Sequence, residues 1–390
     1  SRMTEANHTL SREEISLANW RESPQSQFSF HNVREFIGTQ AVRKSSQPRD
    51  LKFQPLNPND LASIIGQSDL DHWLSASDTD AFVIIKNGVL VCDWRSGYYL
   101  SNQPHIVFSV SKSITGMLAG KIQDLGYLDP TKRVQDYLPE SHRGGYANCK
   151  IQHLLDMQAE IDFNEDYLDQ SGTFADYRSA TGWNPSTSST KAFKGLAPFL
   201  LALKSNGKTH GTLFRYLSPN SDLLGLVLER VMGQRYASLL SDHIWQPLGC
   251  AHDAYVTVDA EGTARSAGGI CVHPHDLARL GLALIEVDSE RSENVISHRW
   301  IHDTFNAGNQ GAWQQGEFSA LLPDGNYRNQ WYRTQATGGA LLAIGIHGQW
   351  LYANPSRQVV IVKLSSQPQP VNDAQDIQLI NDFQKLAETL

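Results

Sequence analysis

The chain has 390 residues and a formal net charge of −8, with 33 lysines and arginines against 41 aspartates and glutamates. This acidic balance, without a basic run, leaves phosphate backbones nothing to pair with, so nucleic acid and anionic membrane are not expected partners. A hydrophobic fraction of 40% is typical of a globular protein and excludes a disordered one.

The start of the chain carries no recognisable targeting signal. No apolar run approaches the ~18 residues of a membrane span, and residues 1–7 are polar. We therefore expect a cytoplasmic protein, while a start trimmed from a precursor is left open. The cysteines are never spaced as Cys-x-x-Cys, which favours buried free thiols over disulfides or a zinc cage. They are Cys92, Cys149, Cys250 and Cys271.

The first part of the chain contains an extended segment, a helix and a β-hairpin that precede one central helix. Residues 1–60 are polar and interrupted by prolines, and we interpret them as an extended arm without chemistry. Residues 60–74 have the pattern of a capped helix. Residues 80–94 contain two apolar runs about Lys-Asn-Gly, which predicts a β-hairpin leading towards that central helix.

The pattern at 109–125 predicts an amphipathic helix that ends at Gly126. Ser109 and Lys112 lie near its start, and residues three apart on a helix are neighbours. This spacing places an amine beside a hydroxyl, as a serine nucleophile requires for loss of its proton. The buried face recurs at three- and four-residue steps through Ile114, Met117, Leu118, Ile122 and Leu125.

The rest of the chain places helices in the middle and strands at the end. The predicted helices are 191–203, 221–232, 236–245 and 373–390, and the predicted strands are 327–333, 341–346, 350–353 and 359–364. We therefore predict an α/β fold, with one sheet built from both termini, flanked by helices, and a mainly helical subdomain inserted. The predicted parts are 1–130, 131–254 and 255–390.

Three segments carry a family resemblance: HIVFSVSK at 105–112, LGYLDP at 125–130 and VQDYLP at 134–139. They resemble the serine β-lactamases and D-alanyl-D-alanine peptidases, especially the class C type. Residues 156–167 and 344–349 look most like the 6-aminohexanoate dimer hydrolases, a branch that also cleaves carboxylic esters. The resemblance implies an antiparallel sheet, with the active site in a groove between the sheet and the helical part.

The resemblance also implies roles for individual residues. Ser109 is the expected nucleophile, and Lys112 and Tyr216 are expected to move its proton. Tyr216 occupies the place of the family's Tyr-x-Asn motif, although Ser218 stands where the asparagine belongs and is expected to contact substrate. A neighbouring ammonium should lower the pKa of the phenol, while burial should lower the pKa of the lysine.

The family's third motif, Lys-Thr-Gly, is replaced by Gly-Ile-His at 345–347. The amides of Ser109 and Ile346 are still expected to form an oxyanion hole. The missing lysine removes a cation that would bind a substrate carboxylate, which puts β-lactam specificity in doubt.

Further substrate contacts follow from the same resemblance and from the aromatic residues nearby. Tyr167 matches a tyrosine that donates to the leaving nitrogen in the nylon-oligomer branch. His347 is a candidate for assisting the leaving group. Trp331 and Tyr332 are candidates for walls of the cleft, although an aromatic pair on a strand commonly belongs to the core.

These features predict a serine hydrolase that cleaves small linear amides and carboxylic esters through an acyl-enzyme. No metal or other cofactor is expected, the partner is a small amide or ester substrate, and a homodimer is left open. Alternatives are a β-lactamase or D-alanyl-D-alanine carboxypeptidase, and a non-catalytic relative that binds acyl ligands. A zinc hydrolase is more distant, because His273-Pro-His275-Asp276 lacks the usual ligand spacing and Asp276 is better placed to begin a helix at 277–286.

Overall fold

The structure is a computed structural model that describes residues 10–187 and 190–390. The polar start that underlies the expectation about targeting, residues 1–7, lies outside the described residues. Within the described ranges, no helix is both long and apolar enough to cross a membrane.

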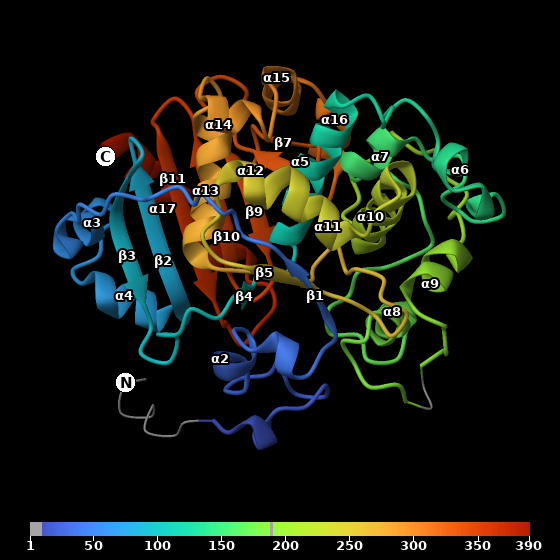
Figure 1. Ribbon diagram of the computed structural model, residues 1–390, viewed down its shortest axis with the longest axis horizontal. Coiled ribbons are helices and arrows are strands. Elements are labelled where there is room, and N and C mark those ends of the chain that lie inside the picture. Colours follow the sequence, from blue (N-terminus) through green and yellow to red (C-terminus); the bar gives the residue numbers. More distant parts are fainter. Residues whose placement is uncertain (1–9, 188–189) are drawn as a thin grey trace.

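A seven-stranded antiparallel sheet forms the centre of the molecule, in the order β3-β2-β11-β10-β9-β8-β7 (Figure 1). Val362 lies opposite Val83, so the predicted N-terminal hairpin pairs directly with a C-terminal strand. The α/β fold class and the sheet built from both ends of the chain are confirmed. The strands are β2 (Thr79–Lys86), β3 (Val89–Arg95), β7 (Asn326–Arg328), β8 (Trp331–Arg333), β9 (Leu341–Gly345), β10 (Gln349–Asn354) and β11 (Val359–Ser365).

Both faces of this sheet are covered, because alternate side chains of its central strands enter two different cores. In β2, Val83 and Ile85 belong to one core, while Phe82 and Ile84 belong to the other. The first core is closed by α5 (Val110–Asp124) and α13 (Pro274–Ile285). The second is closed by α3 (Pro58–Ile64), α4 (Leu70–Ala76) and α17 (Asp373–Thr389).

A smaller sheet has the order β1-β5-β6-β4 and joins the N-terminal segment to the rest of the fold. The segment expected to be an extended arm supplies β1, and it packs Trp20 and Phe30 into a third core. The remaining bounds here are β1 (Thr39–Val42), β4 (His105–Ile106), β5 (Ala254–Thr257), β6 (Ile270–Val272), α2 (Ser26–Ser29) and the 3-10 turns Arg12–Glu14 and Val33–Glu35.

The mainly helical region lies beside the large sheet (Figure 1). Its helix α10 packs against α5 and α7. The domain boundaries proposed at 130 and 254 stay a prediction. The helices are α6 (Val134–Tyr137), α7 (Ile151–Leu155), α8 (Thr173–Ala180), α9 (Leu196–Ala202), α10 (Ser218–Met232), α11 (Tyr236–Leu240) and α12 (Gln246–Leu248), with a 3-10 turn at Pro139–Ser141; α14 (Glu290–Glu293), α15 (His298–Asn306) and α16 (Gln310–Gln315) follow later in the chain.

Several predicted elements are divided in the structure by local backbone chemistry. The helix expected at 60–74 is split into α3 and α4, because Gly66 is left-handed and the Asp69 side chain caps a new helix start. The strand expected at 327–333 is a hairpin, since Asn329 and Gln330 have φ angles of 55° and 72°. The helix expected at 236–245 is not interrupted, but it changes from α11 to the π-helical segment Ser241–Trp245 and runs on into α12.

Helix α5 approaches the β7–β8 turn so closely that only glycine fits at position 116. A Cβ there would overlap the carbonyl oxygen of Asn329 and lie 2.9 Å from the Cβ of Gln330. Because backbone and a buried side chain form this contact, the neighbours have little room to move.

We expect Gly116→Ala to lower the free energy of unfolding by about 1–3 kcal/mol, the usual cost of overpacking a core. Gly311→Ala is the matched control, because a Cβ there would meet only Asn309 Oδ1 at 3.4 Å. Urea unfolding followed by circular dichroism measures both variants. Equal stabilities would contradict the close approach of α5.

Candidate active site

Ser109 lies at the N-terminal cap of α5, immediately after a strained residue. Phe108 has a φ angle of 45°, a left-handed conformation that is costly for a bulky residue. Its ring is held between aromatic neighbours, with ring centroids 5.1 Å from Phe30 and 5.8 Å from Trp183. The aromatic core thus fixes the backbone that presents Ser109.

The Lys112 amine is buried beside the Ser109 hydroxyl. Its Nζ donates to Ser109 Oγ at 2.6 Å and to the carbonyl oxygen of Ala267 at 2.9 Å. Burial, helped by the nearby Arg265 cation, lowers the pKa of Lys112 to about 7, against the opposing effect of the Glu165 carboxylate. A large fraction of the amine is therefore neutral at neutral pH and able to accept the serine proton.

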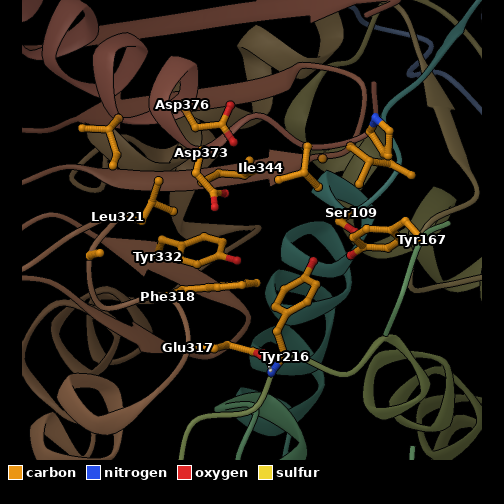
Figure 2. A pocket seen from close by; sticks show the side chains of 16 residues that line it. Ser109, Tyr167, Tyr216, Glu317, Phe318, Leu321, Tyr332, Ile344, Asp373 and Asp376 are labelled. Carbon is orange, nitrogen blue, oxygen red and sulfur yellow. Dashed lines mark hydrogen bonds between the residues drawn. The ribbon is translucent and has the colours of Figure 1, made fainter. Parts of the chain in front are cut away.

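Tyr216 lies across the cavity, and Figure 2 shows its hydroxyl pointing towards Ser109. Lys112 Nζ is 5.0 Å from the centre of its ring. Burial raises the pKa of Tyr216 above its usual range; the Glu165 carboxylate adds to this, while a hydrogen bond with Ser109 opposes it. The expectation of a lowered phenol pKa is therefore wrong, because burial outweighs the Ser109 hydrogen bond and the Arg265 cation, which both lower the pKa. Tyr216 keeps its proton at rest and is suited to relaying a proton.

Two backbone amides face the same cavity. Neither the Ser109 nor the Ile346 N–H donates to any described residue, and both residues line the cavity. Gly345 makes this approach possible, since a Cβ there would lie 2.5 Å from the Val107 carbonyl oxygen and 3.1 Å from Ser109 N. Paired free donors beside a nucleophile have the arrangement that stabilises an oxyanion.

The cavity at Ser109 has a volume of about 190 Å³. Its walls combine apolar side chains with carboxylates. These wall residues come from the loop at 317–321, from β9 and from the start of α17 (Figure 2). Sequence reasoning missed most of these residues, because no motif marks them and only the fold brings them together. The cavity-lining residues that sequence reasoning missed include Glu317, Phe318, Leu321, Asp373, Asp376 and Ile377.

Tyr167 lines the cavity, and a carboxylate that sequence reasoning missed holds its hydroxyl. Tyr167 donates to Glu165 Oε2 at 2.7 Å. The same carboxylate accepts the Ser218 N–H at 2.5 Å and the Ser218 hydroxyl at 2.8 Å. Ser218 is buried and does not line the cavity, which corrects its expected contact with substrate. Its role is to anchor Glu165 at the start of α10.

Of the aromatic pair on β8, only Tyr332 lines the cavity. Trp331 is fully buried on the opposite face of the strand, where its indole N–H donates to the Ser113 carbonyl oxygen at 3.0 Å. The expected cleft wall at Trp331 is wrong, because neighbouring strand residues point to opposite faces.

His347 also departs from its expected role. Its Nδ1 donates to the Gln367 carbonyl oxygen at 2.7 Å, and burial lowers its pKa to about 3. A neutral ring held in this way cannot supply a proton to a leaving group at neutral pH. His347 lines a neighbouring cavity and not the one at Ser109.

The histidine motif at 273–276 serves the start of α13. His273 Nδ1 accepts from the His275 N–H at 3.1 Å, and Asp276 accepts from the amides of Ala251 and His252. In the part of the chain that the structure describes, no group of three or more His, Cys, Asp or Glu side chains is placed to hold a metal ion. All cysteines are free and buried.

The chain is similar to known proteins in both sequence and structure. The 6-aminohexanoate-dimer hydrolase of Paenarthrobacter ureafaciens is 32% identical over 357 residues, covering 92% of this chain and 89% of that protein. A Bacillus anthracis structure assigned as a 6-aminohexanoate-dimer hydrolase aligns with a TM-score of 0.88 at 23% identity, covering 98% of each chain. A class C β-lactamase in complex with cefoxitin aligns with a TM-score of 0.58 at 14% identity, covering 86% of this chain and 100% of that one.

The two solved structures confirm the predicted fold. The sequence comparisons confirm the resemblance that the motifs indicated, since the family model described as Beta-lactamase matches residues 75–385. The chain therefore belongs to the β-lactamase family and is a hydrolase.

Proposed function

We propose that the protein is a serine hydrolase that cleaves small linear amides and carboxylic esters through an acyl-enzyme. The observation that carries this proposal is the hydrogen bond of 2.6 Å between the buried Lys112 Nζ and the Oγ of Ser109, which lines the cavity. A hydroxyl beside an amine with a pKa of about 7 is an activated nucleophile at neutral pH.

In this mechanism, Ser109 Oγ attacks the carbonyl carbon as neutral Lys112 takes its proton. The amides of Ser109 and Ile346 bind the developing oxyanion. Tyr216 relays the proton from Lys112 to the leaving amine or alcohol, and an acyl ester on Ser109 results. Water then attacks this ester by the same route in reverse. Tyr167 offers a second proton donor to a leaving nitrogen.

The lining of the cavity favours linear substrates over β-lactams. Ile344 on β9 and Ile346 just after it line the cavity where the family carries a lysine, and the carboxylates of Glu317, Asp373 and Asp376 line the same cavity. A β-lactam places a carboxylate close to its scissile bond, and Ile344 and Ile346 offer that carboxylate no fixed cation. The named activity of the Paenarthrobacter relative, hydrolysis of a linear amide dimer, supports the same choice.

The first expected outcome concerns pH. Because only neutral Lys112 accepts the serine proton, kcat/KM for p-nitrophenyl butyrate should rise with pH through about 7 and level off above it. Well below this pKa, the rate should fall by about tenfold per pH unit. Initial rates between pH 5.5 and 8.5 give the profile. A rate that falls or stays flat across this interval would exclude Lys112 as the base.

The second expected outcome concerns the nucleophile. A fluorophosphonate probe should label Ser109 alone, and Ser109→Ala should lower turnover by at least ~10⁴. Tyr216→Phe should lower acylation by ~10² to 10⁴, because it removes a positioned proton carrier. Peptide mapping by mass spectrometry locates the label. Label at Ser111 or Ser113 would overturn the assignment, and no label at all would favour a non-catalytic acyl-binding relative.

The third expected outcome concerns the substrate. Linear amides and short-chain esters should be turned over at least about tenfold better than a chromogenic cephalosporin, the difference that one missing charge-assisted hydrogen bond makes. The measurement is kcat/KM for p-nitrophenyl butyrate, the 6-aminohexanoate dimer and the cephalosporin at a single pH. A higher value for the cephalosporin would identify a β-lactamase instead.

A further inference from the structure

A second cavity adjoins the one at Ser109. Tyr167 and Pro370 line both cavities, and the neighbouring residues Ile346 and His347 line one each. The second cavity has a volume of about 600 Å³. The N-terminal segment at 17–23 forms one of its walls, so residues without an assigned role border the substrate region.

Two arginines that line this second cavity form no ion pair with a carboxylate of residues 10–187 or 190–390. Arg178 is only 8% exposed, and its one hydrogen bond runs from Nη1 to the Tyr167 carbonyl oxygen at 3.0 Å. Arg21 Nη2 donates to the Asn184 side chain, whereas its buried Nη1 has no acceptor among the described residues. The nearby Arg265, by contrast, has a carboxylate partner, since Asp222 accepts a hydrogen bond from its Nη1 at 3.0 Å.

Aromatic rings stabilise both guanidinium groups in part. The Arg178 Cζ is 4.4 Å from the centre of the Phe174 ring, and the Arg21 Cζ is 4.8 Å from that of Trp20. Such contacts satisfy the faces of a guanidinium, but not the N–H donors at its edge. Arg178 thus keeps N–H donors for a ligand in the cavity, and Arg21 adds its charge and a buried Nη1 that has no acceptor among the described residues.

Neither Arg21 nor Arg178 forms an ion pair with a carboxylate in the described structure. Burial lowers the pKa of Arg21, and repulsion from the Arg178 and Arg265 cations adds to this effect. Burial is also the main reason for the low pKa of His347, to which Arg21 and Arg178 contribute. The Glu165 carboxylate offsets only part of the effect of burial on Arg178, whose pKa is lowered to about 10. An anion bound beside both guanidinium groups would reduce the cost that remains.

Two carboxylates stand at the rim of the cavity, but neither forms an ion pair with these arginines in the described structure. Asp169 Oδ1 accepts the N–H groups of Ser171 and Gly172 at 3.0 and 2.9 Å. Glu22 is exposed to solvent. The interior of the cavity therefore keeps its positive character.

We propose that Arg21 and Arg178 form an anion subsite of the same active site and bind a carboxylate that the substrate carries at a distance from its scissile bond. The proposal rests on the serine hydrolase function above. Guanidinium groups pair with carboxylates through parallel hydrogen bonds, which provides both strength and orientation. The preferred substrates are then amides or esters with a carboxylate at the end of an aliphatic chain that passes Tyr167.

The test uses two pairs of substrates that differ only in this carboxylate. N-butyryl-6-aminohexanoate and N-butyrylhexylamine place it on the leaving group, and p-nitrophenyl hydrogen adipate and p-nitrophenyl hexanoate place it on the acyl group. In at least one pair, we expect kcat/KM to be about tenfold or more higher for the carboxylated member. This preference should shrink as ionic strength rises.

Variants locate the source of the preference. Arg178→Gln and Arg21→Gln should each reduce the ratio of the carboxylated to the neutral substrate by about tenfold. The ratio cancels losses common to both substrates, and the two variants lie on different segments, so poor folding of one leaves the other informative. Arg143→Gln, at an exposed position away from both cavities, is the matched control and should keep the wild-type ratio.

The outcomes separate the two proposals. If the neutral substrates are hydrolysed while the wild-type ratio is near one in both pairs, the anion subsite is wrong and the serine hydrolase stands. A wild-type preference that persists in both variants would also overturn the assignment to these arginines. If none of the four substrates is hydrolysed, the hydrolase proposal fails and the subsite proposal fails with it.

Discussion

The structure depends on keeping one amine out of water. In the proposed mechanism Lys112 can act as a base because burial weakens its hold on a proton, and burial of an amine without compensation would cost the fold several kcal/mol. The compensation comes from the Ser109 hydroxyl and the Ala267 carbonyl, which accept its hydrogen bonds. Asp222 supports the second acceptor by binding the Ala267 N–H at 2.9 Å. Reactivity and stability are thus opposed at this position, and the surrounding polar network balances them.

Elements of three separate hydrophobic cores position the residues of the active-site cavity. The serine helix closes one face of the large sheet, α17 supplies a cavity wall from the other face, and the aromatic N-terminal core holds Phe108 in its strained conformation. A rigid setting of this kind is what acid–base chemistry requires, because a proton passes efficiently only over hydrogen-bond distances. The helical region adds Tyr167 and Tyr216, so the large sheet, the helices on both of its faces and the helical region all contribute to the cavity.

The sequence predicted what depends on local periodicity. The serine helix, the N-terminal hairpin and the pairing of Ser109 with Lys112 follow from residue spacing alone. The choice between Trp331 and Tyr332 was not accessible, because a shift of one residue in register exchanges the two faces of a strand. The direction of the Tyr216 pKa shift depends on depth of burial, and residues such as Asp373 enter the site only through tertiary contacts. These properties are set by packing, which no motif records.

The pairing of β2 with β11 has a consequence for how the molecule is made. These two strands are neighbours in the sheet, with Val83 opposite Val362, but they lie far apart in the sequence. The centre of the sheet therefore cannot form until β11 has left the ribosome. The serine helix is synthesised early but lacks its sheet support, and Ile346 is still missing from its cavity. In an incomplete nascent chain, Ser109 and Lys112 are therefore present before the cavity that Ser109 shares with β9 and α17 can form.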